Sequence, residues 1–141
     1  MLEIIAGKKG KGKTKYLLEI ANSSMAQAKG TIVFLDKNVK HMFELDRKIR
    51  LINVCDFPVN TLEAFLGFLC GIISQDHDLE EVCLDSFLTI ASLEDDMENV
   101  ETAIKEVDAL GDKYGIRFVL SISMDKDDLP ESVRDQVTVS L

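Results

Sequence analysis

Residues 2–14 read Leu2-Glu3-Ile4-Ile5-Ala6-Gly7-Lys8-Lys9-Gly10-Lys11-Gly12-Lys13-Thr14, and this stretch decides the expected fold. Residues 2–6 form a short apolar run that predicts a buried strand. Residues 7–14 then satisfy the pattern G-x-x-x-x-G-K-[ST] in full. Its glycines leave room for consecutive backbone N–H groups to converge on phosphate oxygens, and a helix expected from Lys13 would direct its positive N-terminal end at the anion. The stretch therefore predicts a strand, a phosphate-binding loop and a helix in succession.

Individual residues of this loop have expected chemical roles. The pattern assigns the Lys13 ammonium to the β- and γ-phosphates of a nucleotide and the Thr14 hydroxyl to Mg²⁺. The candidate nucleotide-binding set is Gly7, Lys8, Lys9, Gly10, Lys11, Gly12, Lys13 and Thr14. The alternative is a glycine-rich turn before a lysine-rich helix start, but the position between a strand and a helix favours nucleotide binding. Whether the three additional lysines bind phosphate or are solvated loop charges stays open.

Composition indicates one globular domain spanning residues 1–141. Apolar residues make up 46% of the chain and charged residues 29%, which excludes a disordered or fibrous protein. The net charge of −9 argues against a protein that coats nucleic acid or an anionic membrane with its whole surface. No stripe of aromatic and basic residues is evident, and tryptophan is absent, so a nucleic-acid partner is not expected. Five of the 12 lysines nevertheless lie within residues 8–15. Such a cluster in an acidic chain needs an explanation specific to that segment.

The chain shows no signal for export or membrane insertion. Its N-terminus places an apolar run before the basic residues, the reverse of a secretory signal. The longest apolar stretch, Phe65 to Ile73, is too short to span a bilayer. Three cysteines at wide spacings, Cys55, Cys70 and Cys83, form no disulfide framework and are expected as buried thiols. We therefore expect a reduced, cytoplasmic protein.

The remaining apolar runs predict strands that alternate with helices. The further strands are expected at Thr31–Leu35, Leu51–Val54, Glu81–Leu84, Ile116–Ile122 and, as an edge strand, Gln136–Leu141. Continuous apolar runs are typical of strands buried on both faces, which occur in parallel sheets. The sequence therefore predicts an α/β three-layer sandwich with a mostly parallel sheet of five or six strands.

Four helices are expected between these strands. The first begins at Lys13, buries Leu17, Ala21, Met25 and Ala28, and stops at Gly30. A short helix over Asn38–Lys48 would turn Val39, Met42 and Phe43 inward. A third, capped by Asn60 or Thr61 and continuing to Ile73, is apolar nearly all round and is expected to be buried. Gly67 and Gly71 on one of its faces permit close packing, which is favoured inside the molecule and has another copy of the chain as the alternative. In the fourth, apolar residues step from Leu93 to Tyr114, and the acidic other faces are either solvated or meet a basic partner.

Three of the expected strands are followed by an aspartate, a residue type that supports Mg²⁺. These are Asp36, Asp56 and Asp85. Ligands bind beyond the carboxyl ends of strands in open α/β sheets, so all three acids are candidates for the site. Taken singly, each is better explained as a helix cap or turn residue.

The order of these parts resembles that of small P-loop NTPases of the RecA-like, additional-strand group, which includes recombinases, ring helicases and secretion or pilus motors. The resemblance covers roughly residues 1–124 and rests on the phosphate loop, on Val82-Cys83-Leu84-Asp85-Ser86 as a Walker B-like strand, and on Phe118 to Ser123 as a further strand. It implies ATP and Mg²⁺ as ligands, with Asp85 supporting the metal and Lys13 acting in catalysis. It also implies a polar sensor at Ser121 or Ser123, and a homo-oligomer or other protein partner.

One departure from that pattern concerns the residue that orients the attacking water. The family's glutamate follows the Walker B acid, where this chain has Ser86, or ends the second strand, where it has Asp36 and Asn38. Asp36 is the candidate general base in its place. The resemblance thus implies an ATP-binding protein with Mg²⁺-dependent ATPase activity that is low. The alternatives are a nucleotide-dependent interaction or regulatory module related to the motors, and a small-molecule kinase.

Overall fold

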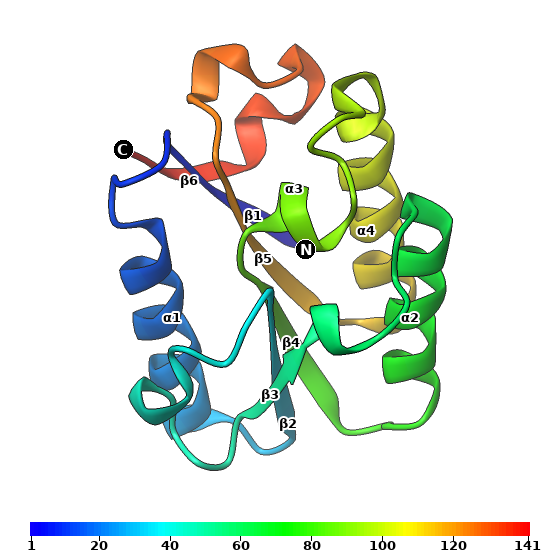
Figure 1. Ribbon diagram of the computed structural model, residues 1–141. Helices are drawn as coiled ribbons and strands as arrows, with labels where there is room; N and C mark the ends of the chain where they lie inside the picture. Colours follow the sequence, from blue (N-terminus) through cyan, green and yellow to red (C-terminus); the bar gives the residue numbers. More distant parts are fainter.

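A computed structural model describes residues 1–141 and shows a six-stranded sheet between two layers of helices (Figure 1). Its strands are β1 (Leu2–Ala6), β2 (Thr31–Asp36), β3 (Arg50–Asn53), β4 (Leu79–Leu84), β5 (Arg117–Ile122) and β6 (Val137–Ser140). Their order in the sheet is β3-β2-β4-β5-β1-β6, and every neighbouring pair is parallel. The predicted α/β class is confirmed, and the sheet is parallel throughout.

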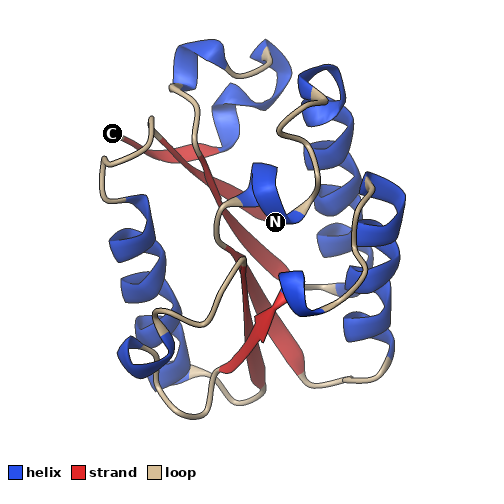
Figure 2. Ribbon diagram, viewed as in Figure 1, coloured by secondary structure: helices blue, strands red, loops and turns tan.

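Three long helices cover the two faces of the sheet. Helix α1 (Lys13–Gln27) lies on one face, and α2 (Leu62–Ser74) and α4 (Val100–Tyr114) lie together on the other (Figure 2). Helix α3 (Phe87–Ile90) is a single turn after β4. Short 3-10 turns complete the chain at Met42–Glu44, Val54–Asp56, Met97–Asn99, Lys126–Asp128 and Glu131–Gln136.

The hydrophobic core is divided by the sheet into two parts. A cluster of 27 buried residues includes side chains of α2 and α4 and of one sheet face, and a cluster of ten includes those of α1 and the other face. Ile4 and Ile5 on β1 belong to different clusters because successive strand residues point to opposite faces. Burial on both faces is why the strands read as continuous apolar runs.

Helix boundaries agree in part with the sequence pattern. Thr61 caps α2, since its hydroxyl oxygen accepts a hydrogen bond from the Ala64 N–H at 3.1 Å. Helix α4 begins only at Val100, so Leu93 and Met97 lie before it. Leu93 is nevertheless fully buried, which explains why the apolar spacing continues back from the helix.

Gly30 has a different role from the predicted helix stop. Helix α1 ends at Gln27, and Ala28 is its C-cap. At Gly30 a Cβ atom would lie 2.0 Å from the backbone oxygen of Asp78. Glycine is required at this position because the chains before β2 and β4 approach closely, not because it terminates the helix.

The predicted helix over Asn38–Lys48 is wrong. Only Met42–Glu44 forms a 3-10 turn, and the three apolar side chains expected to point inward are exposed. Phe43 is 93% exposed, and Val39 and Met42 are about half exposed. Asn22 on α1 fixes the segment instead, by donating to the Glu44 carbonyl and accepting from the Asp46 N–H. Three apolar side chains therefore lie on the surface.

Helix α2 is less buried than its composition predicts. Phe65, Leu69 and Ile73 face the core, whereas Gly67, Cys70 and Gly71 are exposed. A Cβ atom at either glycine would meet nothing within 4 Å, so the prediction that these glycines pack inside the molecule is wrong. Cys55 is also exposed, and of the three predicted buried thiols only Cys83 is buried.

None of the helices has both the length and the apolar character needed to cross a bilayer.

Candidate functional site

The loop after β1 has the backbone conformation that its glycines predict. Gly10 and Gly12 have φ angles of +81° and +89°, which L side chains rarely adopt. A Cβ atom at either residue would meet nothing within 4 Å, so the requirement is conformational rather than steric. Gly12 is also the N-cap of α1. The loop thus leads directly into the positive end of a 15-residue helix.

Asp85 is the strand-end acid that meets this loop. Its Oδ2 accepts a hydrogen bond of 2.9 Å from the Thr14 hydroxyl, across 71 residues of sequence. Its Oδ1 accepts from the Ser121 hydroxyl on β5 at 2.5 Å, and Ser121 in turn accepts from the Ser86 N–H at 2.8 Å. Asp85 is only 3% exposed. Both carboxylate oxygens are therefore held in place at the start of α1.

Lys13 is buried beside this pair. It is 8% exposed, and its Nζ donates to the Lys8 carbonyl at 2.9 Å. Burial lowers the pKa of Lys13, Asp85 opposes that effect, and the positive charge of Lys9 adds to it. An anion bound at the loop would favour the charged ammonium, because a nearby negative charge offsets the loss of hydration on burial.

Asp36 lies behind this site rather than in its opening. It is 2% exposed; its Oδ1 accepts from the Lys37 N–H at 2.7 Å, while Oδ2 has no hydrogen-bond partner. Burial is the main cause of a raised pKa for Asp36, and the nearby Asp85 carboxylate raises it further. The third strand-end acid, Asp56, is exposed and accepts from Asn53, next to the edge strand β3. Sheet order thus separates the three acids, which the sequence alone could not do.

A cavity of about 580 Å³ opens between the loop and the ends of β4 and β5. One part of its wall is polar and cationic and includes Lys9, Lys13, Lys37 and Asp85. The rest is less polar and consists of Leu88, Met97 and Met124 with Thr89 and Glu94 among them. The full lining is Lys9, Gly10, Gly12, Lys13, Thr14, Lys37, Asp85, Ser86, Leu88, Thr89, Glu94, Met97, Ser121, Ser123 and Met124.

Some of the predicted loop residues line this cavity and others do not. Gly7, Lys8 and Lys11 do not line the cavity, and neither does Asp36. Lys8 instead approaches the Asp125 carboxylate at 3.5 Å, whereas Lys9 lines the cavity. Lys37 is a cationic wall residue that sequence reasoning missed, although its place directly after a strand-end acid was an available signal. For Glu94 and Met97 no sequence signal existed, because they reach the cavity from the turns before α4.

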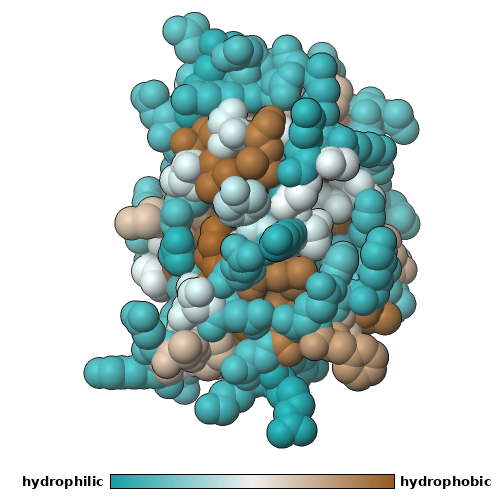
Figure 3. All heavy atoms as spheres, turned by 90° about the vertical axis from the view of Figure 1, so that its left-hand side faces the viewer, coloured by the Kyte–Doolittle hydropathy of each residue, from teal (hydrophilic) through white to brown (hydrophobic).

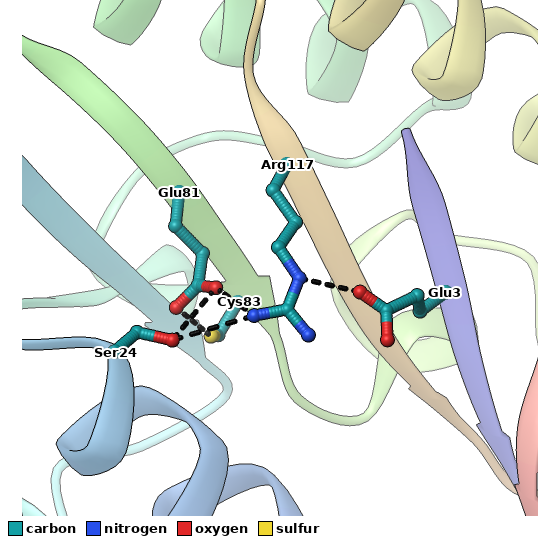
Figure 4. Close-up of polar contacts among 5 residues, drawn as sticks. All are labelled: Glu3, Ser24, Glu81, Cys83 and Arg117. Atoms are coloured by element: carbon teal, nitrogen blue, oxygen red, sulfur yellow. Dashed lines mark hydrogen bonds and ion pairs between the residues drawn. The ribbon is translucent and has the colours of Figure 1, made fainter.

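A second polar cluster lies at the amino ends of the same strands (Figure 4). The Arg117 guanidinium bonds to Glu3 on β1 through Nε and to Glu81 on β4 through Nη1, the latter at 2.7 Å. Ser24 on α1 donates to Glu81 at 3.0 Å, and the Cys83 thiol lies 3.7 Å from the same carboxylate. Burial raises the pKa of Glu81, and Arg117 counteracts this effect. The cluster joins three strands and α1 through one cation.

In comparisons with known proteins, no family model matched the chain and no curated protein matched it significantly.

Proposed function

We propose that the protein binds the Mg²⁺ complex of a nucleoside triphosphate, with ATP the expected nucleotide, and hydrolyses it slowly. The observation that carries the proposal is the 2.9 Å hydrogen bond between Thr14 and Asp85. The sequence pattern assigns the Thr14 hydroxyl to Mg²⁺, and the fold brings an acid from a strand end to that hydroxyl. A glycine-rich turn without a ligand would need no such partner.

The donors at this point suit magnesium. Mg²⁺ prefers hard oxygen ligands, usually one or two from the protein, with the rest supplied by water and phosphate. The Thr14 hydroxyl and the Asp85 carboxylate would hold it, and both are already oriented by their mutual hydrogen bond. When bound, the ion would neutralise charge on the β- and γ-phosphates.

The cavity wall supplies the other contacts that a triphosphate needs. Lys9, Lys13 and Lys37 bring three positive charges to the wall. Lys13 would exchange its hydrogen bond to the neutral Lys8 carbonyl for one to an anionic phosphate oxygen, so that both donor and acceptor carry charge. The backbone N–H groups around Gly10 and Gly12 would bind the oxygens without side-chain obstruction.

The sheet order also supports the assignment. One strand, β5, lies between β1, which leads into the phosphate loop, and β4, which leads into Asp85. This is the arrangement expected of the additional-strand group that the sequence resembles. It positions Ser121 at the end of β5, where its hydroxyl holds Asp85.

Slow rather than fast hydrolysis follows from the available bases. Ser86 carries no carboxylate at the position after Asp85. Asp36 has a free oxygen and a pKa raised toward the range where a general base works well. It does not line the cavity, however, so a water between it and the γ-phosphate would have to enter a buried position.

One observation favours a second candidate function, a small-molecule kinase. The cavity continues past the phosphate-binding wall to Leu88, Met97 and Met124. An acceptor with an apolar portion and a hydroxyl or amine would fit between this wall and the γ-phosphate. Transfer of phosphate from ATP to such a compound, in place of release to water, would establish the kinase.

Calorimetric titration with Mg·ATP tests the proposal. The wild type should bind, and Lys13→Ala should weaken binding by on the order of 1.5–3 kcal/mol, the usual worth of a hydrogen bond to a charged group. Lys11→Ala is the matched control, because Lys11 belongs to the same loop but lies outside the cavity wall; it should change binding little. Absence of binding in the wild type, or equal losses in both variants, would contradict the proposal.

Turnover distinguishes the enzyme from a regulatory module that only binds nucleotide. Phosphate release that Asp36→Asn abolishes would identify Asp36 as the base. Binding without measurable release in the wild type would favour the interaction or regulatory module.

A further inference from the structure

The strand β3 has a neighbour on one side only. It pairs with β2 and forms one edge of the sheet, so its outer N–H and C=O groups have no strand partner. Proteins often protect such edges with proline, bulges or several charges. Residues 50–53 contain no proline, no register shift separates them from β2, and Arg50 is their only charge. Apart from being short, β3 therefore lacks the usual features that prevent an edge strand from pairing with another strand.

A groove adjoins β3 on the α1 side of the sheet. It has a volume of about 650 Å³ and is bounded by the exposed 3-10 turn and by the start of β3. Its apolar lining is Met42, Phe43, Leu45, Ile49 and Leu51. Figure 3 views this side of the molecule and shows apolar atoms exposed between hydrophilic side chains. The Phe43 side chain, almost fully exposed, has no role in the core.

A second groove adjoins β3 on the α2 side. It has a volume of about 460 Å³, its apolar lining is Val33, Ile52, Phe68 and Ile72, and its two charged lining residues, Arg50 and Asp76, are of opposite sign. Gly71 also lines it, and a Cβ atom there would meet nothing within 4 Å, so the missing side chain enlarges the groove. Leu51 lines the first groove and Ile52 the second, as expected for successive residues of a strand.

The first groove is cationic, although the chain as a whole is acidic. Residues 37–50 contain five Lys and Arg side chains and two acidic ones, a net charge of +3 in a chain of −9. Arg47, Lys48 and Arg50 line the groove, with Asp46 as the one acidic lining residue. None of these cations takes part in an ion pair. Their charge is therefore available to a partner.

We propose that β3 binds an acidic, extended peptide segment of a partner protein as a seventh strand. Backbone hydrogen bonds to the outer edge of β3 would hold it, and its alternate side chains would enter the two grooves. Acidic side chains would meet Arg47 and Lys48 in the α1-side groove, and the alternating apolar ones would cover Ile52 and Phe68 in the α2-side groove. A second copy of this chain fits less well, since two molecules of charge −9 repel each other. Phe43 is the only aromatic side chain that lines the cationic groove, which provides little stacking for nucleic acid.

The probe for this site is a short fluorescein-labelled peptide in which Val and Glu alternate, followed by fluorescence anisotropy. We expect saturable binding by the wild type and none for the peptide in which Lys replaces Glu. Gly71→Leu should weaken binding by about tenfold or more by filling the α2-side groove. Gly67→Leu is the matched control: Gly67 lies one turn earlier on the same exposed face of α2, is equally open, and lines no groove beside β3. Both variants replace a helical glycine, so thermal unfolding should show neither to be destabilised.

Two further comparisons test the mode of binding. Methylation of alternate backbone nitrogens of the peptide should abolish binding, because it removes the donors that pair with β3. Arg50→Glu should weaken binding by about tenfold, whereas Lys113→Glu on α4 should not. The proposal is overturned if the wild type does not bind the peptide, if the methylated peptide binds equally well, or if Gly67→Leu and Gly71→Leu lose affinity alike. It is also overturned if the protein alone forms a dimer that Gly71→Leu disrupts, since a second copy would then occupy the edge.

Discussion

Asp36→Asn should stabilise the folded protein at neutral pH. The Asp36 carboxylate is almost completely buried, only one of its oxygens accepts a hydrogen bond, and Asp85 is close enough to raise its pKa. A buried polar group without a partner costs about 1–3 kcal/mol, and more when it is charged. The amide of Asn carries no charge and keeps the acceptor for the Lys37 N–H. We expect a gain of about 1–3 kcal/mol, or roughly 3 °C in Tm for each kcal/mol in a domain of this size.

The gain should depend on pH in a definite direction. Burial raises the folded-state pKa of Asp36 above the unfolded value of about 3.9. Below the unfolded pKa both states hold the proton, and the carboxyl group imposes no ionisation cost. As pH rises through the interval between the two pKa values, the folded state loses stability, and above the folded pKa the cost is complete. The advantage of Asp36→Asn should therefore be largest at neutral pH and shrink toward about pH 4.

Urea unfolding at several pH values measures this effect. Asp56→Asn is the matched control, because it makes the same chemical change at an exposed strand-end acid and should leave stability within about 0.5 kcal/mol of wild type. The reasoning is refuted if Asp36→Asn is less stable than wild type at pH 7, or if its advantage does not vary with pH.

Three other substitutions or reactions test the packing. Gly30→Ala should cost about 3 kcal/mol or more in urea unfolding, because its Cβ would overlap a backbone oxygen that cannot move freely. Arg117→Leu should cost about 3 kcal/mol by the same measurement, the lower end of the range for a broken buried pair, since the Arg117 side chain is 36% exposed. In a thiol-reagent assay Cys55 and Cys70 should react in the native protein, whereas Cys83 should react only after unfolding, because burial raises the pKa of its thiol and excludes the reagent.

The fold could be predicted from sequence where burial is two-sided. Runs such as Leu2–Ala6 and Phe118–Ile122 have no polar alternation because helices cover both faces of the sheet. The segment of residues 37–49 could not be predicted in this way. Its apolar residues have helical spacing, yet Asn22 fixes the backbone of the segment in a conformation that exposes them. Spacing records which residues are apolar, but not whether another element is available to cover them.

The candidate site was predictable only in its local part. The loop from Gly7 to Thr14 is contiguous, so its pattern is visible in one stretch of sequence. Asp36, Asp56 and Asp85 follow equally apolar strands, and the strand order determines which of them meets Thr14. That order depends on how helices pack between strands far apart in the chain, which no local pattern records. The less polar wall of the cavity was missed for the same reason.

Strands β4 and β5 are joined by polar contacts at both ends on the side that faces α1. Glu81 binds Arg117 at their amino ends, and Asp85 binds Ser121 four residues later at their carboxyl ends. A slip of one residue in the β4–β5 register would turn one partner of each pair to the opposite face. Both contacts therefore oppose such a slip. An ion pair about 13 Å from Asp85 thus helps to determine where that carboxylate stands relative to Thr14. The geometry of the candidate site therefore depends partly on an ion pair at the opposite end of the sheet.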